Sequence, residues 1–251
     1  MLSINRLDMK KFAVVVAGGT GMRMGTAVPK QFLPLHDHAI LWYTLKVFLE
    51  TYPDLRVVLV VPAGHPDTAK EVVMTLAGGE RIELVIGGDT RFHSVRNGLE
   101  WIRRELGGES AGEAGRDAII WVHDGVRCLV SGDLIRRCYD QAVELGSAVP
   151  VVDCGDSVRL VEDEGRSKPI DRSRLKFVQT PQTFRGDILL GAYMLDHQEA
   201  FTDEATVVEV AGHKVRLIEG EATNIKITMP EDMAIAEVFL VGACRKGGAG
   251  Q

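Results

Sequence analysis

The sequence lacks the features that mark nucleic-acid-binding, secreted or membrane-spanning proteins. Its 251 residues carry 29 Lys and Arg against 35 Asp and Glu, and this formal net charge of -6 gives no field that attracts nucleic acid. No hydrophobic run approaches the roughly 20 residues that a membrane span needs. Residues 1–11 lack a hydrophobic core followed by a small-residue cleavage site. We therefore expect a cytoplasmic protein with no nucleic acid and no membrane among its partners.

Cysteine is also scarce. Cys128, Cys138, Cys154 and Cys244 are far apart and form no CxxC pair. This spacing excludes a zinc ribbon and offers no disulfide framework. Free thiols in a reducing compartment are the simple interpretation.

What is present is a regular alternation of strand and helix patterns. Continuous β-branched runs predict strands that are buried on both faces of a parallel sheet, at residues 12–16, 57–61, 82–86 and 118–122. Amphipathic stretches at residues 41–49, 93–106 and 132–145 predict helices between them, with Ser94 and Ser131 as candidate N-caps. The alternation predicts a three-layer α/β fold with a mostly parallel sheet, in which ligands bind at the carboxyl ends of the strands. The length predicts a single domain over residues 1–251.

The second half of the chain contains one segment of a different kind. Residues 156–171 place alternating residues on both sides of a charged turn, which predicts an inserted β-hairpin arm that projects from the domain. The core then resumes through residues 174–178. A helix near 188–195, strands near 215–218 and 224–227, and a closing helix over 230–241 are expected after it.

A glycine-rich turn directly after the first strand is the strongest chemical signal. Residues 17–24 read Ala-Gly-Gly-Thr-Gly-Met-Arg-Met, and Pro29-Lys30-Gln31 follows. Glycines allow backbone N–H groups to approach phosphates closely, and cations such as Arg23 and Lys30 neutralise charge on a reacting phosphate. The segment lacks the Gly-Lys-Ser/Thr of a P-loop and the third glycine of a dinucleotide fingerprint. A plain strand-to-helix turn with solvated cations is the alternative.

Further motifs follow in order along the chain. They are Gly-Gly-Asp-x-Arg-x-x-Ser-Val at 87–95, Val-His-Asp-Gly-x-Arg at 122–127, Asp-Arg at 171–172, Gln-Thr-Pro-Gln-x-Phe at 179–184, Thr-Asp-Glu-Ala at 202–205 and Asn-Ile-Lys-Ile-Thr-x-Pro-Glu-Asp at 224–232. With the first loop they resemble the sugar-phosphate nucleotidyltransferases, and among these the 2-C-methyl-D-erythritol 4-phosphate cytidylyltransferase family of the non-mevalonate isoprenoid pathway. The resemblance spans about residues 11 to 240. It implies a Rossmann-like nucleotidyltransferase fold.

The resemblance also implies a reaction. A phosphate oxygen of methylerythritol phosphate attacks the α-phosphorus of CTP in line, and pyrophosphate leaves. Arg23 and Lys30 match the residues that stabilise the transition state, while Arg172 and Lys226 match those that hold the incoming phosphate. Thr180 matches a hydroxyl that contacts this phosphate.

The remaining site residues are carried over from the same motifs. The CTP-binding set that the resemblance implies is Ala17, Gly18, Gly19, Gly21, Arg23, Lys30, Gly88, Asp89, Ser94, Asp124 and Gly125. Gly88, Asp89 and Ser94 match the part that recognises cytosine, and Asp124 matches a residue near the ribose that can hold Mg²⁺. The substrate-binding set is Arg127, Ser157, Arg172, Thr180, Thr202 and Lys226. His123 is assigned to structure, because it has no proton to move in this reaction.

The family resemblance gives the arm a role as well. It implies a homodimer in which the arms interlock and carry Arg172 and Ser157 to the partner's active site. Departures from the family pattern include Val16 in place of proline, Gly18 in place of alanine, Cys128 in place of proline and Ser157 in place of threonine. None of them removes a charged group from the mechanism.

Two other functions compete with this interpretation. A ribitol 5-phosphate cytidylyltransferase shares the fold and the chemistry, and differs in the acceptor pocket. A catalytically inactive nucleotide-binding regulatory protein predicts the loss of Arg23, Lys30 or Lys226, and all three are present.

Overall fold

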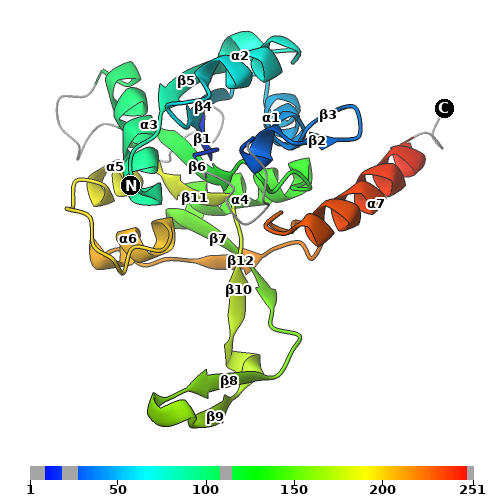
Figure 1. Ribbon diagram of the computed structural model, residues 1–251. Coiled ribbons are helices and arrows are strands. Elements are labelled where there is room, and N and C mark those ends of the chain that lie inside the picture. The colour runs from blue at the N-terminus through cyan, green and yellow to red at the C-terminus, as the bar shows by residue number, and fades with distance from the viewer. Residues whose placement is uncertain (1–8, 19–27, 108–114, 248–251) are drawn as a thin grey trace.

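The computed structural model describes residues 9–18, 28–107 and 115–247. An eight-stranded sheet runs through the molecule in the order β10-β7-β11-β6-β1-β4-β5, with β12 paired to β7 (Figure 1). Its strands are β1 (Lys10–Val16), β4 (Arg56–Val61), β5 (Ile82–Ile86), β6 (Ala118–Asp124), β7 (Ser147–Asp153), β10 (Lys176–Val178), β11 (Gln182–Arg185) and β12 (Leu217–Glu219). The described helices are α1 (Ile40–Thr51), α2 (Pro66–Met74), α3 (Arg91–Glu105), α4 (Gly132–Leu145), α5 (Gly186–Ala192), α6 (Glu204–Val210) and α7 (Pro230–Gly247). A short β2–β3 ribbon (Pro34–Leu35 and His38–Ala39) precedes α1.

Strand β1 lies at the centre of the parallel part of the sheet. It pairs in parallel with β4 on one side and β6 on the other, so that Val16 lies beside both Val60 and Asp124. The carboxyl ends of β1, β4, β5 and β6 therefore meet at one edge of the sheet, where ligands bind in open α/β folds. Strands β10 and β11 run antiparallel to their neighbours, which makes the sheet mixed but mostly parallel, as the sequence predicts.

Two hydrophobic cores cover the two faces of this sheet. Residues of α1, α2 and α4 pack against Ala13, Val15 and the other side chains on one face. Residues of α3, α5 and α6 pack against Phe12, Val14 and the side chains on the opposite face. This alternation along β1 is what a strand buried on both sides requires. The predicted three-layer arrangement is confirmed.

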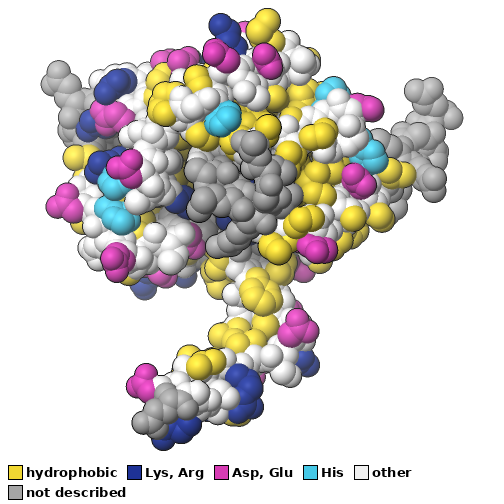
Figure 2. All heavy atoms as spheres, in the orientation of Figure 1, with side chains coloured by type: hydrophobic (Ala, Val, Ile, Leu, Met, Phe, Trp, Pro, Cys, Tyr) yellow, Lys and Arg dark blue, Asp and Glu magenta, His cyan; other side chains and the backbone are white. Residues whose placement is uncertain are grey.

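The predicted projecting arm is present as well. Strands β8 (Val158–Val161) and β9 (Ser167–Ile170) form an isolated antiparallel hairpin, which projects away from the domain beyond β10 (Figure 1). Figure 2 shows hydrophobic side chains along the arm and Lys or Arg side chains at its far end. Val161, Phe177 and Val178 are 73%, 55% and 43% exposed.

Of the two predicted N-caps, one is confirmed and one is wrong. Ser131 caps α4, because its side chain accepts from the N–H of Leu134. Ser94 is not a cap, because α3 begins at Arg91 and Thr90 is its N-cap.

The strand expected at residues 224–227 is irregular backbone. The Asn224 carbonyl accepts from the Arg127 and Gln179 side chains, so the segment is held by side chains and not by a neighbouring strand.

The sequence patterns did not predict strands β7 and β11 or helices α2 and α6. Among the described helices, none is both long enough and hydrophobic enough to cross a bilayer.

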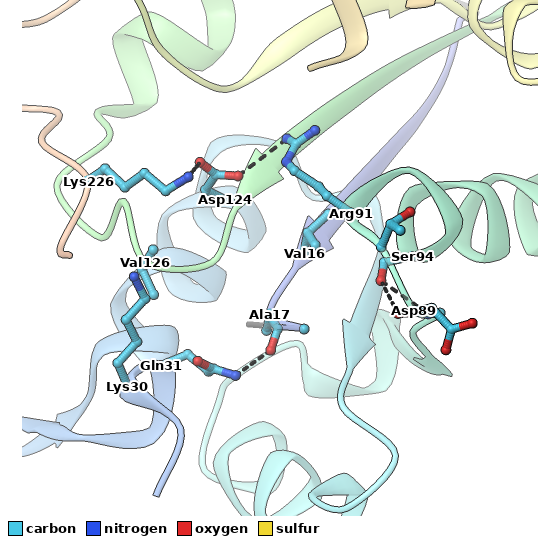
Figure 3. A pocket seen from close by; sticks show the side chains of 13 residues that line it. Val16, Ala17, Lys30, Gln31, Asp89, Arg91, Ser94, Asp124, Val126 and Lys226 are labelled. Carbon is cyan, nitrogen blue, oxygen red and sulfur yellow. Dashed lines mark hydrogen bonds and ion pairs between the residues drawn. The ribbon is translucent and has the colours of Figure 1, made fainter. Parts of the chain in front are cut away.

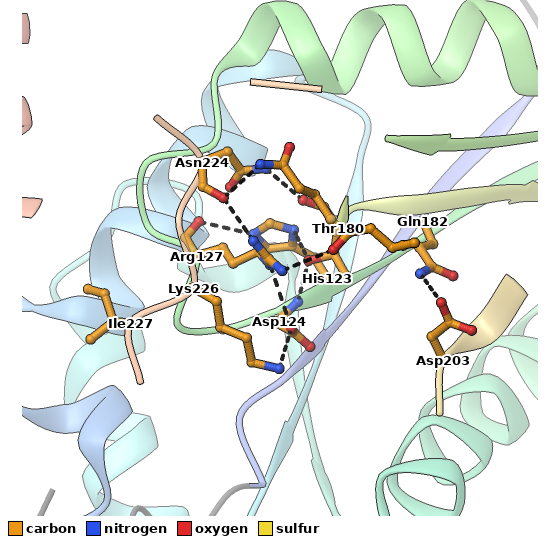
Figure 4. Close-up of polar contacts among 12 residues, drawn as sticks. His123, Asp124, Arg127, Thr180, Gln182, Asp203, Asn224, Lys226 and Ile227 are labelled. Atoms are coloured by element: carbon orange, nitrogen blue, oxygen red, sulfur yellow. Dashed lines mark hydrogen bonds and ion pairs between the residues drawn. The ribbon is translucent and has the colours of Figure 1, made fainter. Parts of the chain in front are cut away.

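A chain of hydrogen bonds fixes the end of β6, where the site begins (Figure 4). The Asp124 N–H donates to Thr180 Oγ1 at 3.0 Å, and this hydroxyl lies 3.0 Å from His123 Nδ1. His123 Nε2 lies 3.2 Å from the Arg127 carbonyl, which only accepts, so Nε2 carries the ring proton and Nδ1 accepts from Thr180. The ring is fully buried, and this burial lowers the pKa of His123 to about 4. His123 is therefore a neutral structural residue.

We expect this buried ring to make the protein sensitive to mild acid. The unfolded chain protonates His123 below its ordinary pKa of 6.5, whereas the folded chain does so only near 4, so the free energy of unfolding falls as the pH is lowered between these values. The loss amounts to about 3 kcal/mol. Urea unfolding from pH 7 to 4 measures it. His123→Gln, which keeps a donor toward the Arg127 carbonyl, should flatten the slope, and equal slopes in both proteins would refute the assignment.

Candidate active site

A cavity of about 380 Å³ opens at the carboxyl edge of the parallel strands (Figure 3). It is lined by residues 16–18, 30–31, 88–91, 94, 124, 126 and 226. These residues come from the ends of β1 and β6, the loop between β5 and α3, the turn that contains Lys30, and the segment before α7. The fold thus brings together eight of the predicted site residues: Ala17, Gly18, Lys30, Gly88, Asp89, Ser94, Asp124 and Lys226.

The first turn of the glycine-rich segment forms one wall. The Ala17 N–H donates to the Val60 carbonyl at 2.8 Å, and the Gln31 side chain donates to the Ala17 carbonyl. Lys30 projects its ammonium to the Ile227 carbonyl at 2.9 Å, which ties the turn to the segment that carries Lys226. Gly19, Gly21 and Arg23 lie outside the described residues.

The loop after β5 forms the opposite wall. Ser94 is buried, and its hydroxyl accepts from the Gly88 N–H at 3.1 Å and lies 3.3 Å from the Gly88 carbonyl. A side chain at Gly88 would place Cβ 2.5 Å from the Cβ of His93, so only glycine allows this loop to close on α3. Ser94 thus holds the loop in place, while Asp89 stands exposed at its rim.

Asp124 is the electrostatic centre of the cavity, with Lys226 and Arg91 on either side of it (Figure 3). Its side chain is 10% exposed and lies 2.9 Å from Lys226 Nζ, 3.3 Å from Arg91 Nη2 and 3.7 Å from Arg127 Nε. Burial alone would raise the pKa of this carboxyl, but the charges of Arg91, Lys226 and Arg127 outweigh it and hold the pKa well below its usual range. Asp124 is ionised at every physiological pH.

Three residues that the resemblance assigned to ligands lie behind the cavity and not in its lining. The Thr180 hydroxyl is committed to His123 and Asp124. Gly125 donates its N–H to the Val16 carbonyl and accepts from Thr44, so both of its peptide groups serve the fold. The guanidinium of Arg127 donates to the Asn224 carbonyl at 2.8 Å and lies 3.7 Å from Asp124 (Figure 4).

Three other assigned residues are not among those that line the cavity of this chain. Thr202 is exposed just before α6. Ser157 and Arg172 are exposed on the arm, where Arg172 donates to the Gly155 carbonyl.

The sequence motifs did not identify two residues that shape the cavity, Arg91 and Glu204. Arg91 lines the cavity and makes a bidentate ion pair with Glu204, which is completely buried. Both residues stand inside motifs quoted from the sequence, at 87–95 and 202–205, but nothing in the spacing shows that they meet.

The side chains that line the cavity could hold a metal ion only together with a ligand that supplies further oxygen atoms. Among the described residues, no group of three His, Cys, Asp or Glu side chains converges to hold a metal ion. Asp124 is one buried, ionised carboxylate, and Mg²⁺ is commonly held by one or two carboxylates plus substrate phosphates. The residues present therefore fit a magnesium ion that arrives with a triphosphate.

Comparison with known proteins agrees with the geometry of this site. A family model described as 2-C-methyl-D-erythritol 4-phosphate cytidylyltransferase matches residues 11–242. A relative of that name from Phocaeicola vulgatus is 38% identical over 232 residues, covering 92% of this chain and 100% of its own. Another from Rubrobacter xylanophilus is 39% identical over 243 residues, covering 94% and 96%.

A solved structure extends the likeness to three dimensions. The crystal structure of a 4-diphosphocytidyl-2C-methyl-D-erythritol synthase superposes with a TM-score of 0.75 at 28% identity, covering 92% of this chain and 99% of that one. Because the family model and the relatives each cover nine-tenths of the chain or more, the chain belongs to the 2-C-methyl-D-erythritol 4-phosphate cytidylyltransferase family.

Proposed function

We propose that this chain transfers a cytidylyl group from CTP to 2-C-methyl-D-erythritol 4-phosphate. A phosphate oxygen of the acceptor forms a bond to the α-phosphorus of CTP, the bond from this phosphorus to the bridging oxygen breaks, and pyrophosphate leaves. The observation that carries the proposal is the cavity itself, where Lys30, Arg91 and Lys226 face a space next to an ionised Asp124. Such a reaction needs positioning and charge neutralisation more than covalent chemistry.

The division of roles follows the walls of the cavity. Gly88, Asp89 and Ser94 form the rim that would read the cytosine. Ala17 and Gly18 would present backbone to the triphosphate, and Lys30 would stabilise the charge that develops at the α-phosphorus, together with Arg23. Lys226 would hold the incoming phosphate, because it lines the cavity and its side chain is 43% exposed.

Magnesium is part of the proposal. Asp124 would hold it against the phosphates of CTP, and the ion would supply charge neutralisation at these oxygens. Lys226 would then give up its contact with Asp124 and turn to the acceptor, since its side chain is 43% exposed and its ammonium sits on a flexible stem.

We also propose a cytoplasmic homodimer formed through the arm, with residues 1–251 as a single domain. An isolated two-stranded hairpin is marginally stable in water. The exposed Val161, Phe177 and Val178 would be covered by a second copy. Arg172, on the arm and away from its own cavity lining, would then act in the partner's site.

The identity of the acceptor is tested directly. Purified protein is incubated with CTP, Mg²⁺ and either methylerythritol phosphate or ribitol 5-phosphate, and pyrophosphate release is measured. We expect release with methylerythritol phosphate alone. Release only with ribitol 5-phosphate would replace the proposed acceptor, and release with neither, despite CTP binding, would favour an inactive regulatory protein.

Replacement of the cation at the first turn tests the mechanism. Lys30→Ala should lower kcat by about a hundredfold or more, because a preorganised charge at the reacting phosphate is lost. Lys70→Ala is the matched control, since Lys70 is exposed on α2. Circular dichroism verifies that both variants are folded. Turnover of the Lys30→Ala protein within a few-fold of the unmodified enzyme would refute the role.

Hybrid dimers test whether Arg172 acts across the interface. Lys30→Ala and Arg172→Ala proteins are each nearly inactive by expectation. If Arg172 serves the partner, a mixed dimer has one site with both residues intact, and a randomly mixed sample recovers about a quarter of the full activity. If Arg172 serves its own site, mixing restores nothing. The unmixed variants are the controls.

A further inference from the structure

Arg91 stands between two buried carboxylates, Asp124 in the lining of the cavity and Glu204 outside it. On the cavity side its Nη2 lies 3.3 Å from Asp124 Oδ1. On the other side it binds Glu204 with both nitrogens, Nη1 to Oε1 and Nη2 to Oε2, the latter at 3.0 Å. Glu204 has no exposed surface, whereas the Arg91 side chain is 28% exposed toward the cavity.

Glu204 is itself held rigidly by groups that do not reach the cavity. The Tyr193 hydroxyl donates to Glu204 Oε1 at 3.2 Å. Glu204 is the first residue of α6, and Asp203 caps that helix by accepting from the Thr206 N–H at 2.9 Å. Gln182 on β11 donates to Asp203 Oδ2 at 2.9 Å and accepts from the Ala205 N–H at 2.8 Å, which fixes the start of α6 to the sheet (Figure 4).

The two cations beside Asp124 are therefore unequal. Lys226 is 43% exposed and reaches Asp124 by a flexible stem with one contact. Arg91 presents a planar guanidinium that is clamped bidentately by a buried carboxylate, an arrangement that fixes direction as well as charge. Arg91 is therefore held by a second partner outside the cavity, whereas the Lys226 side chain has the freedom of an exposed stem.

We propose that Glu204 is a positioning residue that acts through Arg91: it fixes the guanidinium against Asp124 and thereby orients this carboxylate toward CTP. This inference rests on the proposed function, because it assigns the Arg91–Asp124 pair to the CTP half of the site. Arg91 lies between the Gly88–Asp89 rim and Asp124 in the cavity lining, away from the arm that would carry the acceptor-binding Arg172.

The charge states support the arrangement. Burial would lower the pKa of Arg91, but Glu204 and Asp124 raise it, so the guanidinium stays charged. Burial and the Glu204 charge raise the pKa of Tyr193, so its hydroxyl keeps the proton that it donates. A buried ion pair by itself contributes little net stability, since desolvation offsets the attraction. A positioning role accounts for a pair that stability alone does not require.

Calorimetric CTP binding and steady-state kinetics test the proposal. Glu204→Gln keeps the shape of the side chain and removes its charge, so the Kd and KM for CTP should rise about tenfold, as when a residue that orients a metal ligand is lost. The KM for methylerythritol phosphate should stay within about twofold of the unmodified value, because Glu204 and Arg91 act on the CTP half of the site. Glu209→Gln, on the exposed face of α6, is the matched control and should change neither. An unchanged affinity for CTP, with only a lower Tm, would overturn the proposal.

A double-mutant cycle separates positioning from a structural clamp. If Glu204 acts through Arg91, the Glu204→Gln change adds nothing to the Kd for CTP in an Arg91→Gln background. Independent effects that multiply would contradict it. Tyr193→Phe removes one hydrogen bond to Glu204 and covers the case in which Glu204→Gln does not fold. We expect a smaller rise in the Kd for CTP, and an unchanged Kd would count against the proposal.

These measurements also distinguish the inference from the proposed function. If the unmodified protein binds CTP but transfers its cytidylyl group to neither acceptor, the assigned reaction is wrong. The double-mutant cycle on the Kd for CTP still tests the role of Glu204 in that case.

Discussion

The buried carboxylate of Asp124 is the constraint on which the site depends. An ionised group at the end of a buried strand is costly to desolvate unless cations and hydrogen bonds surround it. This chain supplies them from three places that are distant in sequence: Arg91 at the start of α3, Arg127 in the turn after β6, and Lys226 before α7. Each cation ties its segment to the edge of the sheet. The charge that a ligand meets is thus also the charge that assembles the cavity.

The supports of these cations differ, and the difference matters for function. Arg91 and Arg127 each have a second set of partners inside the protein, Glu204 for the first and the Asn224 carbonyl for the second. Lys226 forms an ion pair with Asp124, and its side chain is 43% exposed. A site of this kind has a fixed background of charge and one adaptable cation. Phosphoryl transfer depends on preorganised charge, which the clamped arginines provide.

The sequence predicted the parallel half of the fold well, because continuous β-branched runs such as residues 57–61 are decided by burial on both faces. It failed at residues 224–227, where a strand-like composition is held by side chains of Arg127 and Gln179 that no local pattern reveals. The motifs named eight residues that line the cavity, but they carry no information on where a polar group points. The structure shows that Thr180 and Gly125, which were assigned to ligands, have hydrogen-bond partners within the protein. The Arg91–Glu204 pair spans 113 positions and emerges only when α3 and α6 pack into the same core on one face of the sheet.

The negative net charge of the whole protein makes this local arrangement of cations important. With a formal net charge of -6, the chain repels a polyanion such as a nucleoside triphosphate at long range. At physiological ionic strength that repulsion is screened beyond roughly 8 Å, so affinity has to come from cations within the cavity. Lys30, Arg91 and Lys226 line that cavity, and the carboxylate of Asp124 between Arg91 and Lys226 offsets the repulsion of these two cations. Asp124 and Glu204 therefore allow Arg91 and Lys226 to lie close together in one small cavity before any phosphate arrives.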